Sequence, residues 1–128
     1  MSLDSLRPEI RWAIAAAQEK QAADVTVLCL EKLGAFAEYF LLCTAGSTPQ
    51  MKAIADEIEE QLLRHGKRQQ HREGSKGAEW VLLDYGSFVV HIFSQHARLF
   101  YDLERLWRSA KRIDVPPPGP QAAAEAER

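Results

Sequence analysis

Residues 80–93 read WVLLDYGSFVVHIF, and this stretch decides the fold. It holds two apolar runs, 80–83 and 88–93, which are separated by Asp-Tyr-Gly-Ser at 84–87. Asp commonly opens a turn by hydrogen-bonding to its own backbone, and Gly adopts the positive φ angle that tight hairpin turns require. The pattern therefore predicts two antiparallel strands joined by a tight turn.

Two further apolar runs lie upstream of the hairpin, at 24–30 (DVTVLCL) and 38–44 (EYFLLCT). Runs that are apolar on both faces are typical of strands near the middle of a covered sheet. The polar segment 67–72 predicts a short edge strand, because Lys and Arg discourage aggregation through an exposed sheet edge. Together with the hairpin, these segments predict a sheet of five strands.

Three helices are predicted around these strands. The first runs from about Pro8 to Lys20, and Pro8 suits a first helical turn because its missing N–H has no helical partner there. The second begins with Thr48 as N-cap and Pro49 at the first helical position. Ser94 caps a third helix, whose apolar side chains recur at helical spacing. These side chains are Leu99, Phe100, Leu103, Leu106, Trp107 and Ala110.

The predicted elements make a single α/β domain over residues 1–113, with a mixed five-stranded sheet flanked by helices. Residues 114–128 read DVPPPGPQAAAEAER. The prolines oppose regular structure, and little apolar surface is available to offset the entropy lost on ordering. We expect a disordered Pro/Ala-rich tail over these residues.

The composition limits the classes of function. The chain of 128 residues has a net charge of −2, which argues against a dedicated nucleic-acid-coating protein. No apolar run approaches the roughly 18 residues that span a membrane, and Met1–Arg11 lacks the apolar centre of a signal peptide. Cys29 and Cys43 lie inside apolar runs, so we expect reduced core thiols and a cytoplasmic protein, or one of an organelle matrix.

Four stretches of the chain follow one another in a specific order. They are 23–28 (ADVTVL), 39–44 (YFLLCT) with 51–56 (MKAIAD), the hairpin itself, and Arg98 followed by 101–107 (YDLERLW). In this order they resemble the ribosomal silencing factor family, also called the Iojap family, and the resemblance covers most of the chain. Three features depart from the family pattern. Gln50 stands near the usual Arg, and Ser87 stands where an Asp is common. The loop before Trp80 has Lys76 and lacks the fuller acidic run of many relatives.

The resemblance implies a translational repressor. Such proteins bind the large ribosomal subunit through the ribosomal protein numbered fourteen on its intersubunit face, and they sterically block the small subunit from joining. Organellar relatives assist large-subunit assembly, so an assembly factor is one alternative. The resemblance also implies a nucleotidyltransferase-like topology, which makes a nucleotide-binding or nucleotidyltransferase-like enzyme the other alternative.

The enzyme alternative depends on Gly46-Ser47 before a helix, a turn that can hold phosphate at a helix N-terminus. Metal-dependent catalysis would also need carboxylates on a nearby strand. The acidic residues between 56 and 60 lie on the second predicted helix instead, and the four histidines show no zinc-ligand spacing. We therefore predict no catalytic residue, no metal site and no cofactor.

The predicted partner-binding site lies on the hairpin and its neighbours. Its members are Trp80, Leu82, Asp84, Tyr85, His91, Lys76 and Tyr101. In a strand Trp80 and Leu82 share one face, so Trp80 is either an exposed anchor or part of the core. Asp84 either meets a basic group of the partner or fixes the turn. His91 is either a contact or a hydrogen-bonded structural residue, and Trp107 is expected in the core.

Other charged segments carry weaker expectations. The locally basic stretch 65–76, which includes Lys76, either makes a peripheral contact with ribosomal RNA phosphates or forms a solvated edge. Arg98 and Arg105 lie on predicted polar helix faces and are expected to be solvated. The strand edges and the hairpin also make a homodimer a hypothesis, and no membrane partner is predicted.

Overall fold

The computed structural model describes residues 3–74 and 77–118 as a mixed α/β domain. A short 3-10 helix at Leu3–Ser5 precedes the regular elements. These elements are α1 (Pro8–Glu19), β1 (Ala23–Cys29), β2 (Tyr39–Ala45), α2 (Thr48–Arg64), β3 (His71–Glu73), β4 (Trp80–Asp84), β5 (Phe88–Ser94), α3 (Gln95–Tyr101), α4 (Leu103–Leu106) and β6 (Lys111–Asp114).

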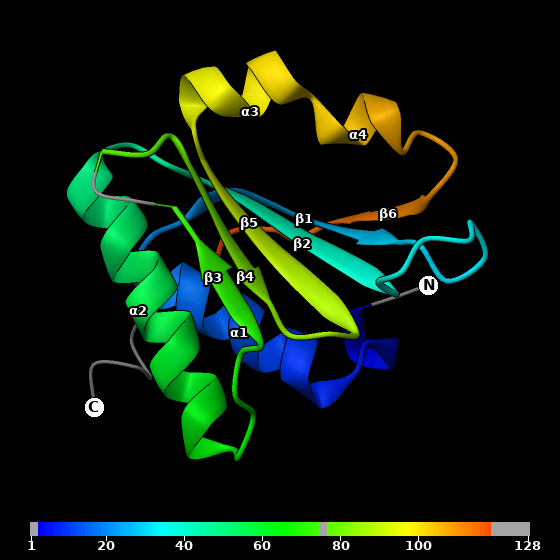
Figure 1. Cartoon of the computed structure of the whole chain (residues 1–128), viewed down its shortest axis with the longest axis horizontal. Helices are drawn as coiled ribbons and strands as arrows, with labels where there is room; N and C mark the ends of the chain where they lie inside the picture. Colours follow the sequence, from blue (N-terminus) through cyan, green and yellow to red (C-terminus); the bar gives the residue numbers. More distant parts are fainter. Residues whose placement is uncertain (1–2, 75–76, 119–128) are drawn as a thin grey trace.

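The strands form one mixed sheet in the order β3-β4-β5-β2-β1-β6. β2 and β5 pair in parallel, whereas the other neighbours are antiparallel. α1 and α2 pack on one face of the sheet, which we call the first face, and α3 and α4 lie across the other, the second face (Figure 1). The predicted single α/β domain is therefore confirmed.

The hairpin forms as its sequence predicts. Trp80 lies opposite Phe93 and Asp84 opposite Val89, so the turn spans the residues between β4 and β5. Gly86 has φ +85°, and a Cβ there would approach the Gln70 side-chain nitrogen to 2.6 Å. Asp84 Oδ1 accepts the Gly86 N–H at 2.8 Å, which satisfies the tight turn locally.

The first face carries the larger core. Ile10 of α1 and Ile54, Ile58 and Leu62 of α2 are fully buried against the sheet. Full burial of one such side chain contributes about 1.5–3 kcal/mol relative to leaving it in water. Gln50, where the family resemblance leads one to expect a nearby Arg, donates to the carbonyls of residues 20 and 21 and so ties the start of α2 to the end of α1.

The sheet has six strands, which corrects the predicted five. The strand that was missed, β6, pairs with β1 along its whole length. Its residues Lys111, Arg112 and Asp114 are charged and precede prolines, so no apolar alternation marks it. An edge strand needs only backbone pairing on one side and tolerates such residues. β6 extends one residue into the predicted tail; residues 119–128 lie outside the described residues, and a disordered tail there stays a prediction.

The predicted third helix is interrupted, which is a second correction. Asp102 adopts the left-handed conformation, with φ +45°, and separates α3 from α4. The break removes the continuous apolar stripe, so Leu99, Phe100 and Leu106 are 82%, 70% and 71% exposed while Leu103 is buried. Asp tolerates this backbone region better than most residues, which makes it a suitable position for the break.

Smaller details of the prediction also change. Ser47 rather than Thr48 caps α2, because the Ser47 hydroxyl accepts the Gln50 N–H at 3.2 Å. The edge strand β3 begins at residue 71, later than predicted. Both cysteines are free thiols; Cys43 is buried, and burial raises its pKa to about 12, whereas Cys29 is only half-buried. Within residues 3–74 and 77–118, no helix is long and apolar enough to cross a membrane.

Candidate protein-docking site

The second face of the sheet is incompletely covered. Its buried cluster combines strand side chains with two residues of the short helices, Ala97 of α3 and Leu103 of α4. Four larger side chains are only partly buried at its margin. They are Trp80, Leu82, Trp107 and, more exposed, Tyr101. Partly exposed aromatic and aliphatic side chains beside a packed core are the usual composition of a protein-binding surface.

Trp80 lies at the centre of this margin. Burial alternates along β4, so Trp80 and Leu82 are half-buried on the second face while Val81 and Leu83 are buried on the first. The Trp80 ring lies 4.6 Å from the Tyr101 ring and 5.0 Å from the Phe93 ring, measured between centroids. Trp80 is therefore neither fully buried in the core nor free in solvent. Its ring is held by neighbouring aromatic rings and stays partly exposed.

His91 on the neighbouring strand β5 contacts Trp80 and fixes its orientation. The Trp80 indole N–H donates to His91 Nδ1 at 3.0 Å, and the His91 ring also meets the edge of Phe40 at 4.5 Å. An indole nitrogen can only donate, so the proton of neutral His91 must reside on Nε2. His91 is 4% exposed, and burial lowers its pKa to about 4. This position matches the structural alternative for His91 rather than a surface contact.

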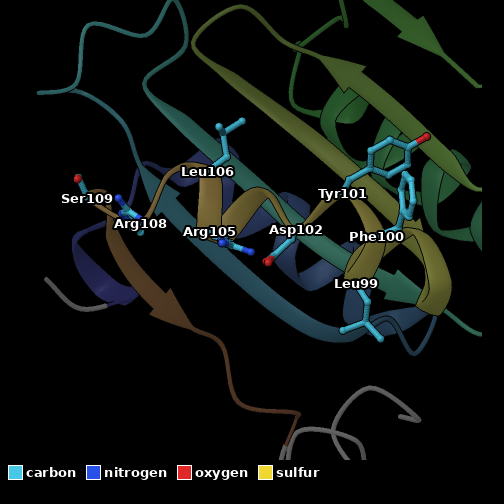
Figure 2. A pocket seen from close by; sticks show the side chains of 8 residues that line it. All are labelled: Leu99, Phe100, Tyr101, Asp102, Arg105, Leu106, Arg108 and Ser109. Atoms are coloured by element: carbon cyan, nitrogen blue, oxygen red, sulfur yellow. The ribbon is translucent and has the colours of Figure 1, made fainter.

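Tyr101 continues the aromatic surface onto the short helices. It is 48% exposed, and its ring lies 5.1 Å from that of Phe100 in an edge-to-face arrangement. A groove of about 660 Å³ runs along α3 and α4 (Figure 2). Its lining residues are Leu99, Phe100, Tyr101, Asp102, Arg105, Leu106, Arg108 and Ser109.

A buried arginine holds the short helices on the sheet, which corrects the expectation that Arg98 is solvated. Arg98 is 9% exposed and makes two hydrogen bonds to the Glu104 carboxylate, at 3.1 and 3.2 Å. Its remaining donors reach the Asp24 carbonyl and the hydroxyls of Thr26 and Thr44. Arg98 thereby links α3 to α4 across the break, and it holds both helices against β1 and β2.

Sequence reasoning missed this role for a physical reason. The partners of Arg98 come from β1, β2 and α4, and no local pattern reports such distant contacts. Asp102 was the one available signal, since an Asp inside a predicted helix favours a cap or a break. Arg105 is exposed, as predicted.

The hairpin turn does not join the same surface. Asp84 shares the second face with Trp80 but lies at the far end of β4, and it accepts the Gly86 N–H. Tyr85 packs against the first-face core instead, where its ring stacks on Phe88 at 5.0 Å and burial raises its pKa to about 12. Lys76 lies outside the described residues.

The basic stretch at 65–76 is partly neutralised by neighbours. Arg72 pairs with Asp56 at 3.2 Å and Glu59 at 2.7 Å, and His71 lies 2.9 Å from the Glu73 carboxylate. The Gly46-Ser47 turn is occupied by the cap of α2, since the Ser47 hydroxyl accepts a helical N–H. Across the described ranges, no three His, Cys, Asp or Glu side chains gather closely enough to hold a metal ion.

Proteins of one family are similar to this chain. Residues 3–128 match the family described as "Ribosomal silencing factor during starvation". The chain is 40% identical over 106 residues to the "Ribosomal silencing factor RsfS" of Bacillus subtilis (strain 168), covering 83% of this chain and 90% of that protein. It is 36% identical over 104 residues to "Protein Iojap, chloroplastic" of Zea mays, covering 79% of this chain and 44% of that protein.

Two solved structures share the fold. A crystal structure of a protein from Chromobacterium violaceum superposes with a TM-score of 0.76 at 30% identity, covering 94% of this chain and 99% of that chain. A crystal structure of a protein from Bacillus halodurans superposes with a TM-score of 0.70 at 33% identity, covering 83% of this chain and 96% of that chain. The arrangement of helices and strands described above is therefore shared with these two solved structures.

Proposed function

Because the chain belongs to the ribosomal silencing factor family, we propose that it represses translation by docking on the large ribosomal subunit and sterically blocking the small subunit. The receiving surface is the ribosomal protein numbered fourteen on the intersubunit face. Family membership was predicted from the ordered motifs and is confirmed, and it supports a ribosomal silencing role. The mode of docking is our proposal.

The observation that carries the proposal is the half-exposed pair Trp80–Tyr101 on the second face. Aromatic side chains dominate the energetics of protein interfaces, especially where their orientation is already set before binding. His91 sets the orientation of Trp80 through its hydrogen bond, and Leu82 extends the apolar surface beside it. Trp80, Leu82 and Tyr101 are therefore the contacts that we propose.

The other predicted site residues take supporting roles in this proposal. Asp84 shapes the turn, and the acceptor capacity it retains suits a basic group at the edge of the interface. His91 positions Trp80, and Tyr85 stabilises the hairpin from the first face. A contact from Lys76 stays a prediction.

Steric occlusion requires no bond to be made or broken, so the proposed mechanism uses no catalytic residue and no cofactor. An interface of standard size buries about 800 Å² on each partner, which is enough for specific binding. The protein then works in the compartment where ribosomal subunits join, which is the cytoplasm in a bacterium. An assembly factor would use the same docking site with a different outcome.

The direct test is sedimentation of the protein with purified large subunits, with and without small subunits. We expect the protein to cofractionate with large subunits and to reduce the peak of joined ribosomes. An assembly factor would cofractionate without reducing that peak. Absence of cofractionation would contradict docking altogether.

A matched pair of tryptophan variants tests the site. Trp80→Ala removes the proposed anchor and is expected to weaken docking by about 2 kcal/mol, roughly 30-fold. Trp12 on α1 is also half-buried, but it stacks on His65 away from the second face, with ring centroids 3.7 Å apart. Trp12→Ala should leave docking unchanged. Equal effects of the two variants would argue against the second face.

The same face supports the homodimer hypothesis, because an exposed apolar surface is partly hidden when two copies meet. Mass measured over a range of protein concentrations tests it. A dimer that Trp80→Ala dissociates would use the docking surface, whereas a monomer at all concentrations would exclude the hypothesis.

A further inference from the structure

A short basic segment borders the proposed docking surface. Residues 105–112 read RLWRSAKR and hold four basic side chains and no carboxylate. Arg112 pairs with Asp114 at 2.8 Å and lies 3.7 Å from Glu104. Arg105, Arg108 and Lys111 are exposed, and none of them has an ion-pair partner in the part of the chain that the structure describes. The segment therefore presents three uncompensated charges.

This charge contrasts with the rest of a chain whose net charge is −2. α2 carries four carboxylates on the first-face side of the molecule, and its basic residues Lys52 and Arg64 are paired within the helix. α2 and α4 lie on opposite faces of the sheet (Figure 1), and Lys111 lies on the edge strand β6. Arg105 and Arg108 thus lie on the side that would face the ribosome in the proposed complex, and Lys111 lies at the neighbouring sheet edge.

The groove adds a second element to this surface. Arg105 and Arg108 both line it, together with the aromatic rings of Phe100 and Tyr101 (Figure 2). Guanidinium groups bind phosphate oxygens in a planar, bidentate way, and exposed aromatic rings stack on bases. A groove that offers both kinds of group is suited to an RNA strand.

We propose that Arg105, Arg108 and Lys111 bind the phosphate backbone of ribosomal RNA next to the protein surface that receives Trp80. This inference rests on the proposed function, since it assumes docking on the large subunit. It places the RNA contact at the segment from α4 to β6, away from the stretch 65–76, where Arg72 is already paired with Asp56 and Glu59. The contact carries no base sequence requirement.

Salt dependence separates RNA from an acidic protein as the partner of these cations. A phosphate backbone carries condensed counterions, and each cation that replaces one adds about 0.7–0.9 to the slope of log affinity against log salt concentration. Carboxylates scattered on a protein surface hold no such layer of counterions. The slope therefore reports the chemistry of the partner, whereas affinity at one salt concentration does not.

The experiment measures binding of the full chain to purified large subunits between about 50 and 200 mM salt. The test variant combines Arg105→Gln, Arg108→Gln and Lys111→Gln. The control combines Arg11→Gln, Lys67→Gln and Arg68→Gln, which removes the same charge from exposed positions on α1 and after α2. Melting temperatures of both variants should equal that of the wild type, because all six side chains are exposed.

We expect the slope of the test variant to be smaller than that of the wild type by roughly 2, and the slope of the control to be unchanged. Equal slopes for the test variant and the wild type would overturn the inference. Weaker binding with an unchanged slope would also overturn it, because it would identify a protein partner. Failure of the wild type to bind large subunits at any salt concentration would contradict the proposed function itself.

Discussion

The two faces of the sheet differ in how completely helices cover them. α1 and α2, with 12 and 17 residues, close the first face over a continuous buried core. α3 and α4, with 7 and 4 residues, leave aromatic and leucine side chains exposed on the second. Both faces belong to the same strands, so the difference comes from the helices alone. The first face therefore carries the larger buried core, and an accessible apolar surface is available on the second.

The largest expected effect comes from the residue that fastens the second face. Arg98→Ala removes five hydrogen bonds, including those to the half-buried Glu104 carboxylate and to two buried threonine hydroxyls, and we expect a loss of about 3–5 kcal/mol in the free energy of unfolding. Denaturant unfolding measures it. The control is Arg105→Ala, which removes an exposed charge and should stay within about 0.5 kcal/mol. Equal losses would mean that Arg98 contributes nothing beyond its charge.

The first face is tested by a cavity in its core. Ile58 is fully buried, so Ile58→Ala should lower the free energy of unfolding by about 2–5 kcal/mol. Leu106→Ala on the second face removes a comparable side chain that is 71% exposed, and it should change stability by no more than about 0.5 kcal/mol. A large loss from Leu106→Ala would show that the second face is more closed than described.

The free energy of unfolding is expected to depend on pH because of His91, which is buried on the second face. Burial lowers the pKa of His91 from 6.5 to about 4, so the unfolded chain binds more protons between these values. The contribution of neutral His91 to the free energy of unfolding is fully present above about pH 6.5, and it is lost as the pH falls towards 4. Between pH 7 and pH 5 the free energy of unfolding should fall by about 2 kcal/mol.

His91→Gln isolates this effect, because glutamine does not titrate while its amide oxygen can accept a hydrogen bond from Trp80. Unfolding of both proteins would be measured at pH 7 and pH 5. We expect the variant to lose the decrease that the wild type shows. Asp56 and Asp114, whose pKa values are held low by Lys52 and Arg112, act at more acidic pH and do not confuse the comparison. An equal decrease in both proteins would exclude His91 as its source.

The smallest expected effect concerns docking without a change in stability. Tyr101→Ala removes a ring that is 48% exposed and packs against the Trp80 ring at an interplanar angle of 47°. Docking on large subunits should weaken by about 1 kcal/mol, roughly fivefold, while the melting temperature stays close to that of the wild type. Tyr85→Ala is the contrasting variant, since Tyr85 packs on the first face and should lower stability without a specific effect on docking.

Much of the fold could be predicted because local patterns specify it. The apolar runs of β1 and β2, the Asp-Tyr-Gly-Ser turn and the prolines at the start of the long helices are each readable within a few residues. The shared face of Trp80 and Leu82 follows from strand alternation alone and is confirmed. The ordered motifs also sufficed to predict the family.

The features that the structure adds all depend on distant partners. β6 exists because β1 offers its free edge, and Arg98 is buried because β1, β2 and α4 together satisfy its donors. The exposure of Leu99, Phe100 and Leu106 follows from the break at Asp102, which a periodic apolar pattern conceals. Their spacing along the chain is the same in an intact and a broken helix.

By itself, the amino-acid sequence determined five of the six strands, the hairpin and the long helices, because turn chemistry and apolar periodicity act over a few neighbouring residues. Its ordered motifs determined the family. Only the tertiary structure decided which side chains are accessible. Trp80 became a supported, half-exposed ring because His91, Phe93 and Tyr101 meet it from two other elements. The exposure of a side chain depends on contacts from elements far apart in the sequence, so no local sequence pattern predicts it.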